Sequence, residues 1–414
     1  MFLTTISHPE DSSTASPAST TTTATASPPS SNPDADALCP APTLNTSQAE
    51  LLLHYTTSTA LTFSGRKNPK ILTFWRHNAP HIGLSHPFVL HLLLSSSAFH
   101  LAHLTTNPDK NTQPLFPYRS SRNEYLSLAR QHLATGIAGF SAQLAHLTPE
   151  TAGALYLAAV LTCYCTFADE PRSRDDLLVC TTTTAAAAGT SPGRPDEEEA
   201  AVARMPFVCG VRLVRASFGT EVLFAGLMAP LGPGTPSELL REPVCVRDGF
   251  ARVEWEAAVE GLRGFVAAAA AEEQRVPLGA LDALIEIYAA VYGRRGLDGR
   301  ITYAGPPENQ FVFGWLYRVE PEFVACVRRC EPTALLVLAH YAVLLNTDAV
   351  QEGWYVEGWR EHIIARVGEM LGDGYRGSEW MRWPTEHVLR EPDDQRREMR
   401  DGEWLAHEQH CERP

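Results

Sequence analysis

Between residues 45 and 390, apolar side chains recur every three or four residues along most of the chain. One such stripe follows Thr148-Pro149-Glu150, a typical helix start with proline first and an acid in the first turn. Another stripe runs from Val356 to Leu371 and stops at Gly372, a typical helix end. Alternating strand patterns are scarce. The pattern predicts an all-α fold, a single large helical bundle-like domain.

The segment Phe88 to Leu104 is apolar on nearly every side of a helix. A helix with this pattern is usually buried, so we expect it at the centre of the bundle. The segment also carries three histidines and three serines. Because it is short and partly polar, we predict that it does not span a membrane.

Three biased segments flank or interrupt the helical domain. Residues 1–44 are rich in Ser, Thr, Pro and Ala, and residues 181–201 form a low-complexity insertion. Such compositions bury too little apolar area to offset the entropy of ordering, which predicts disorder. Residues 391–414 are predicted to be a charged tail. The expected α-helical domain therefore covers residues 45–390.

The net charge of −14 is spread along the chain. An acidic balance disfavours contact with nucleic-acid phosphates, so we predict no direct DNA binding by this chain. Nine cysteines are scattered and include no Cys-x-x-Cys pair. This excludes a visible zinc-cluster domain, which needs closely spaced thiolates, and disfavours a secreted disulfide framework.

Metal and enzyme chemistry have few candidate residues. His100 with His103, and Cys326 with Cys330, are each one helical turn apart and could share a metal, but core positions explain both pairs more simply. Asp175-Asp176 lies in a polar loop, which argues against a magnesium-dependent terpene synthase. There is no nucleophile elbow, phosphate loop or His-Glu-x-x-His motif. We predict no enzymatic activity, no cofactor and no bound metal.

Two regions carry a resemblance to a known family. The first contains Leu51 to Tyr55, Trp75 and the segment His86 to Ala102. The second contains Pro332 to Asn346, then Trp354 to Leu371, and closes with Glu379 to Pro384. In order and spacing, these regions resemble the C-terminal regulatory domain of fungal zinc-cluster transcription factors of the sterol uptake control protein-like group.

The resemblance implies a nuclear transcription regulator whose helical domain binds a sterol or another apolar small molecule in a hydrophobic pocket. It also implies a homodimer, or a heterodimer with zinc-cluster factors. The zinc cluster itself would then be lost, or encoded upstream of Met1.

Aromatic residues supply the candidates for this pocket. The primary candidates are Phe88, Leu92, Phe99, Tyr341 and Trp359. A wider set of aromatic and Met residues could line a cavity between helices or simply form core: Trp75, Tyr156, Tyr164, Phe224, Met228, Phe313, Trp315 and Tyr355.

Two other functions stay open. The chain could be a stand-alone protein-interaction module that modulates a full-length relative without DNA binding of its own. It could also be an all-α enzyme whose motif is not recognisable.

Overall fold

The computed structural model describes residues 46–63, 69–106, 120–169, 171, 173–180, 205–232, 252–268, 275–305, 311–345 and 353–389. All of these belong to one compact unit, Pro42–Pro414. The segments 1–44, 181–201 and 391–414, which were predicted to be disordered or tail-like, lie outside the described residues.

The all-α prediction is confirmed, because helices dominate the described residues and the two strands there are short. The N-terminal helices include two π-helical turns, Tyr55–Thr59 and Phe74–Asn78, and a 3-10 turn, Gly226–Leu231. The α-helices of this group are α1 (Thr46–His54), α2 (Ala60–Phe63), α3 (Pro69–Thr73), α4 (Ala79–Ser85), α5 (Pro87–Thr106), α6 (Arg122–Leu144), α7 (Pro149–Ala168), α9 (Met205–Ser217) and α10 (Thr220–Leu223).

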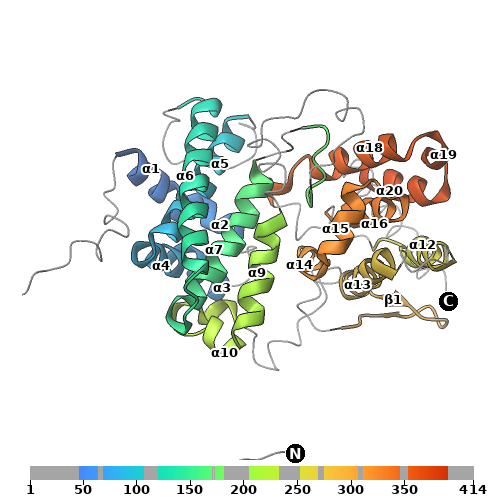
Figure 1. The fold of residues 1–414 in the computed structure, drawn as a ribbon, viewed down its shortest axis with the longest axis horizontal. Helices are drawn as coiled ribbons and strands as arrows, with labels where there is room; N and C mark the ends of the chain where they lie inside the picture. The colour runs from blue at the N-terminus through green and yellow to red at the C-terminus, as the bar shows by residue number, and fades with distance from the viewer. Residues whose placement is uncertain are drawn as a thin grey trace, which may run out of the picture. The chain divides into compact units, whose positions relative to one another are not determined.

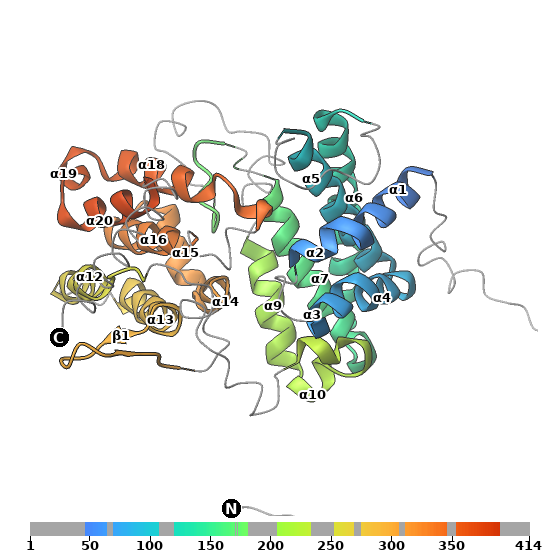
Figure 2. The same ribbon diagram turned by 180° about the vertical axis from the view of Figure 1, so that it is seen from behind.

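The C-terminal group lies beside α9 in both ribbon views (Figures 1 and 2). Its antiparallel strands β1 (Arg294–Arg295) and β2 (Ile301–Thr302) pair Arg294 with Thr302. Its helices are α12 (Glu256–Ala268), α13 (Arg275–Val291), α14 (Gly314–Arg318), α15 (Pro321–Arg328), α16 (Pro332–Leu344), the 3-10 helix η7 (Trp354–Val356), α18 (Trp359–Leu371), α19 (Asp373–Arg376) and α20 (Glu379–Leu389).

Helix α5 is buried on almost all sides, as its composition predicts. It packs most extensively on α6 and α7, so it lies at the centre of the N-terminal group. Its serines are satisfied across helix contacts. Ser95 Oγ donates to the Ala129 carbonyl at 2.9 Å, and Ser97 Oγ donates to the Leu51 carbonyl at 2.6 Å. These bonds offset the cost of placing hydroxyl groups in the core.

Helices α5 and α7 are each 20 residues long and are apolar enough to cross a membrane by length and composition alone. The expectation that the first is too short and too polar is therefore wrong on that criterion. Most of each helix is buried inside the fold, however, and core helices commonly meet the same criterion.

The segment 173–180, which follows α7, packs against α18. Leu177, Leu178, Val179 and Cys180 are buried. Asp175 forms an ion pair with Arg366 on α18, and the Asp176 carbonyl lies 2.7 Å from His362 Nε2. The Asp175-Asp176 pair thus lies outside a helix, as predicted, and its first carboxylate is used in an ion pair.

Candidate ligand-binding region

The structure does not gather the five primary pocket candidates into one region. Phe88 and Leu92 face α6, where Gly136 and Gly139 allow a close approach. Phe99 is buried in the same helix α5. Tyr341 stacks on Trp315 within the C-terminal group, at 4.4 Å between ring centroids. Trp359, the first residue of α18, packs against the C-terminal end of α7, and its Nε1 donates to the Phe167 carbonyl at 2.8 Å.

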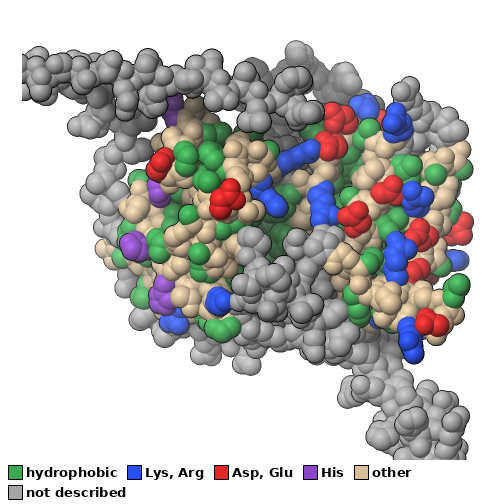
Figure 3. Space-filling model, turned by 90° about the horizontal axis from the view of Figure 1, so that it is seen from below, with side chains coloured by type: hydrophobic (Ala, Val, Ile, Leu, Met, Phe, Trp, Pro, Cys, Tyr) green, Lys and Arg blue, Asp and Glu red, His purple; other side chains and the backbone are tan. Residues whose placement is uncertain are grey.

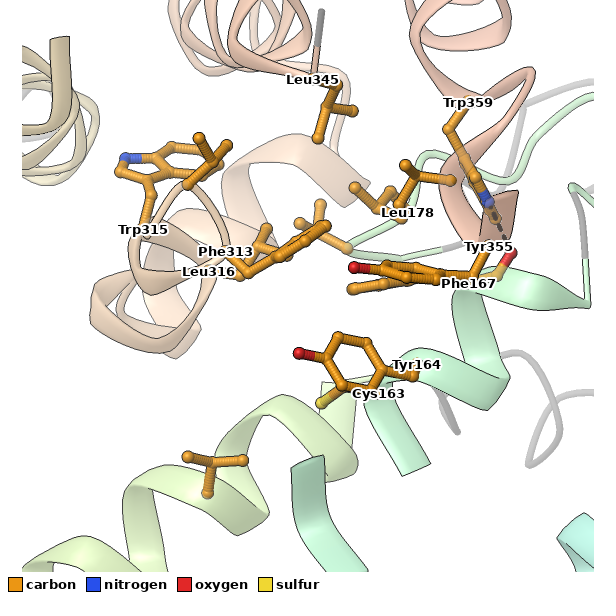
Figure 4. Packing of buried hydrophobic residues seen from close by; sticks show 14 of the residues in the cluster. Cys163, Tyr164, Phe167, Leu178, Phe313, Trp315, Leu316, Leu345, Tyr355 and Trp359 are labelled. Atoms are coloured by element: carbon orange, nitrogen blue, oxygen red, sulfur yellow. Dashed lines mark hydrogen bonds between the residues drawn. The ribbon is translucent and has the colours of Figure 1, made fainter. Parts of the chain in front are cut away.

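Several residues of the wider aromatic set do meet, between α7 and the C-terminal group. Tyr164 on α7 lies 4.8 Å from Tyr355 on η7, measured between ring centroids. Phe313, which precedes α14, lies 6.5 Å from the Tyr164 ring and 6.0 Å from the Tyr355 ring. Figure 4 shows the hydroxyl ends of both tyrosines pointing toward the side of Phe313 and α14.

Further aromatic rings surround this contact from the N-terminal group. Phe63 stacks on Tyr164 at 4.9 Å and lies 5.1 Å from Trp75. Phe167 stacks on Phe313 at 5.5 Å. Rings from α2, α7, η7 and the start of α14 therefore form one continuous wall, which is apolar except at the phenol oxygens.

Five tyrosines are here called the tyrosine cluster, because the phenols of the others act electrostatically on Tyr164 or are acted on by it: Tyr55, Tyr156, Tyr164, Tyr317 and Tyr355. Burial raises the pKa of Tyr164 well above its ordinary value, and the neighbouring phenols of Tyr355, Tyr156 and Tyr55 raise it further. Burial likewise raises the pKa of Tyr317, which shares a hydrogen bond with the Cys163 thiol. All these phenols are therefore neutral at physiological pH and can donate or accept hydrogen bonds.

Exposure falls from one end of the tyrosine cluster to the other. Tyr156 and Tyr317 are half-buried. Tyr164 and Tyr355 are each 7% exposed, and Tyr55 is fully buried. Tyr55 Oη has no hydrogen-bond partner among the described residues. A buried hydroxyl left unpaired costs about 1–3 kcal/mol, so a hydrogen-bonding partner for Tyr55 Oη would stabilise the folded protein.

Histidines form two close pairs, each with one member on α5. His54 Nε2 lies 3.3 Å from His100 Nδ1, and the Trp354 ring stacks on His100 at 4.9 Å. His91 Nδ1 lies 2.9 Å from His132 Nδ1. Burial lowers the pKa of His54 and of His132 to about 4. These side chains are therefore neutral and share hydrogen bonds near pH 7.

In both residue pairs that were considered as metal ligands, side chains make other contacts. His103 Nδ1 lies 3.3 Å from Glu357, and Trp354 packs against both His100 and His103. Arg329 donates to Cys326 Sγ at 3.5 Å. Within the described ranges, no three His, Cys, Asp or Glu side chains are placed to hold a metal ion.

Sequence reasoning missed part of this region. Tyr55 was noted only as part of the family resemblance, and Phe63, Cys163 and Tyr317 were not pocket candidates. Tyr317 lies on a five-residue helix, too short for any periodicity to show which way its side chain points. Only the packing of α14 against α9 and α13 places it.

A scan against models of known protein families finds no match to this chain. A search of curated proteins likewise finds no similar sequence.

Proposed function

We propose that this chain is the helical regulatory domain of a transcription regulator and responds to an apolar small molecule bound at the tyrosine cluster. The resemblance of its two end regions to fungal zinc-cluster factors motivates the regulatory role. The all-α fold agrees with that resemblance. A regulator of this kind acts in the nucleus and pairs with itself or with a zinc-cluster factor that supplies the DNA contact.

The observation that carries the proposal is the position of the tyrosine cluster. Tyr55, Tyr156 and Tyr164 come from the N-terminal group, and Tyr317 and Tyr355 come from the C-terminal group. Aromatic walls with a few phenol groups suit an apolar ligand that carries a small number of polar atoms. A ligand held there contacts both groups of helices at once, so its binding can change how firmly they are joined.

A thermal-shift titration with a panel of sterols and other lipids tests the proposal. A ligand that binds only the folded state stabilises it by roughly 2.7 kcal/mol at a hundredfold excess over its dissociation constant. We expect at least one member of the panel to raise the melting temperature. A panel in which no compound shifts the transition, at concentrations up to solubility, contradicts the proposal.

Two conservative variants locate the site. Tyr355→Phe removes one hydroxyl from the tyrosine cluster and should reduce the ligand-induced shift. Tyr341→Phe is the matched control, since Tyr341 is also buried but stacks on Trp315 elsewhere. A loss of the shift in Tyr341→Phe alone would return the site to the residues first chosen from the sequence.

The alternative, a stand-alone interaction module, is favoured by one observation. Leu53 on α1 and Leu61 on α2 are 45% and 42% exposed, and Leu84 on α4 is 54% exposed. Exposed leucines on neighbouring helices are suited to contact with another protein. Light scattering of the purified chain should show a dimer that Leu53→Asp with Leu61→Asp converts to monomer, and a concentration-independent monomer argues against this alternative.

A further inference from the structure

Residues 173–180 form an irregular segment that inserts apolar side chains into the core, here called the 173–180 turn. Two hydrogen bonds close it on itself. The Leu177 amide donates to the Cys180 carbonyl at 2.8 Å, and the Val179 amide donates to the Leu177 carbonyl at 2.7 Å. The side chains of Leu177, Leu178, Val179 and Cys180 are all buried. The turn therefore contributes to the core without belonging to a helix.

The side chain of Leu178 reaches the aromatic wall of the candidate ligand-binding region. Figure 4 shows it directed toward the space bounded by Trp359, Tyr355 and Phe167. Because Leu178 is only 3% exposed, it fills this space instead of covering it from outside. Part of the wall that suits an apolar ligand is thus already in contact with a leucine of the same chain.

Side chains of α18 hold the beginning of the turn close to Trp359. His362 Nε2 donates to the Asp176 carbonyl at 2.7 Å, and the His362 ring lies edge-on to Trp359 at 6.1 Å between ring centroids. Asp175 forms an ion pair with Arg366, one turn farther along α18. These contacts place the turn against the same face of α18 that carries Trp359.

The remaining links between the turn and α18 are ion pairs near the surface. Glu369 accepts from Arg366 at 3.0 Å and pairs with Arg174 at 2.7 Å. The Arg174 side chain is 71% exposed. Water and salt screen such pairs, which contribute little to stability. Apolar burial, and not charge, therefore provides most of the attraction that keeps the turn in place.

The backbone of Leu178 is strained in this position. Among the described residues other than glycine, only Leu178 and Cys330 have a positive φ, 68° and 59°. In that left-handed region the Cβ of a leucine comes too close to the following carbonyl oxygen. The strain persists because burial of the side chain outweighs it, and it is released when the turn leaves the core.

We propose that the 173–180 turn is a displaceable plug, in which Leu178 occupies the space beside Trp359, Tyr355 and Phe167 until an apolar ligand replaces it. The inference rests on the proposed function and adds the regulation of the same site. The ligand buries apolar surface in place of Leu178, and the strain of the turn is released in exchange. Ligand binding is thereby coupled to release of the turn from α18.

An uncharged sterol is a suitable probe for this exchange. Figure 3 shows the face seen from below, on which the acidic and basic side chains of the described residues are intermixed. This face presents no field of a single sign that would attract a charged ligand. The probe is cholesterol delivered from cyclodextrin, and equilibrium binding of the tritiated sterol to the full chain measures its affinity.

Hydrogen exchange with and without saturating cholesterol gives the direct readout. The amides of Leu177 and Val179 should exchange at least about tenfold faster with the sterol, since the expelled turn loses its burial and its hydrogen bonds. Amides at the end of α7, near Phe167, should exchange more slowly. Unchanged or slower exchange in the turn would overturn the inference, because a turn that stays in place is covered further by the ligand.

Two variants separate displacement of the turn from simple enlargement of the space. Leu178→Ala should bind cholesterol about tenfold or more tightly, because burial of the leucine no longer competes with the ligand. Asp175→Asn leaves the space unchanged and removes one link to Arg366. It should tighten binding about two- to fivefold, the range of a partly exposed ion pair.

Each variant has a matched control on the helices that do not contribute to the aromatic wall. Leu262→Ala removes the same atoms from a fully buried position on α12. Asp282→Asn removes the partner of Arg263, whose Nε lies 2.6 Å from Asp282 Oδ1. Both controls should leave the affinity for cholesterol unchanged, including where Leu262→Ala lowers the melting temperature.

The outcomes distinguish this inference from the proposed function. Equal affinities in all chains, or tighter binding in Leu178→Ala with no change in Asp175→Asn, overturn the plug and leave ligand sensing in place. Binding that is tighter in both variants, or that appears only in both variants, supports the plug. If cholesterol binds neither the unaltered chain nor Leu178→Ala, the inference fails, and the other lipids of the panel decide the proposed function.

Discussion

At the scale of single residues, the interior contains many polar groups that stay neutral. His340 is fully buried with its Nδ1 2.8 Å from the Leu336 carbonyl, and burial lowers its pKa to about 4. His54 and His132 have pKa values near 4 for the same reason. Each favours the folded state only while it is uncharged, which links stability to pH.

We predict that the protein loses stability as the pH falls from 6.5 toward 4. In this window the unfolded chain binds protons at these histidines and the folded chain does not, so unfolding becomes easier as acid is added. Each histidine contributes about 1.4 kcal/mol per pH unit. Urea unfolding between pH 7.5 and 4.5 measures the slope, which His132→Gln should reduce and the exposed His146→Gln should not. A flat profile over this range contradicts the burial of these histidines.

At the scale of helices, the sequence predicts that a long helix forms more reliably than it predicts which helices pack against it. Pro149 begins α7, as the local motif predicts, and the Thr148 amide donates to Thr151 Oγ1 at 3.4 Å. The pattern of α5 predicts its burial. It does not predict that Phe88 and Leu92 face α6, because a helix that is apolar all round can be turned toward any partner. The absence of side chains at Gly136 and Gly139 on α6 allows Leu92 and Phe88 to pack closely there.

Gly136→Ala should destabilise the protein even though alanine favours helix. An added Cβ would lie 2.8 Å from Leu92 Cγ and 3.2 Å from the Phe88 carbonyl oxygen. The resulting overpacking costs about 1–3 kcal/mol. Gly264→Ala on α12 is the control, because a Cβ there meets nothing within 4 Å. It should stabilise by up to about 1 kcal/mol, as measured by chemical denaturation. Similar effects of the two changes would contradict the close packing of α5 on α6.

At the scale of the molecule, a few contacts join the two groups of helices. Trp359 donates to the Phe167 carbonyl, Trp354 Nε1 donates to Thr62 Oγ1 at 3.0 Å, and Arg366 pairs with Asp175. These pairs are far apart in sequence. No periodicity links their members, so the sequence predicted only some aromatic residues of the region, such as Tyr164, Phe313 and Tyr355, and did not predict which of them meet.

Trp359→Phe should cost about 1–3 kcal/mol, because it removes a buried hydrogen bond and shrinks a fully buried side chain. Trp380→Phe should cost less, because Trp380 is half-buried and stacks on Phe265 at 5.3 Å. Thermal unfolding of both variants provides the comparison. A larger loss in Trp380→Phe would show that the contact between α18 and α7 contributes little.

The net charge and the scattered cysteines concern the whole chain. We predict no sequence-specific DNA binding by the purified protein at near-physiological salt, because the sequence has a net charge of −14 and no Cys-x-x-Cys pair. A mobility-shift titration with a set of DNA duplexes checks this. Tight binding that depends on the DNA sequence would contradict this prediction.

Hydrogen exchange with and without a stabilising lipid tests the central claim most directly. The account predicts that the ligand slows exchange along α7 from Tyr156 to Phe167, in α14 and in η7, since these elements form the tyrosine cluster and its walls. It predicts little change in α12 and α20, which contribute none of those side chains. Protection confined to α12 and α20, or to the contact between α5 and α6, would contradict binding at the tyrosine cluster.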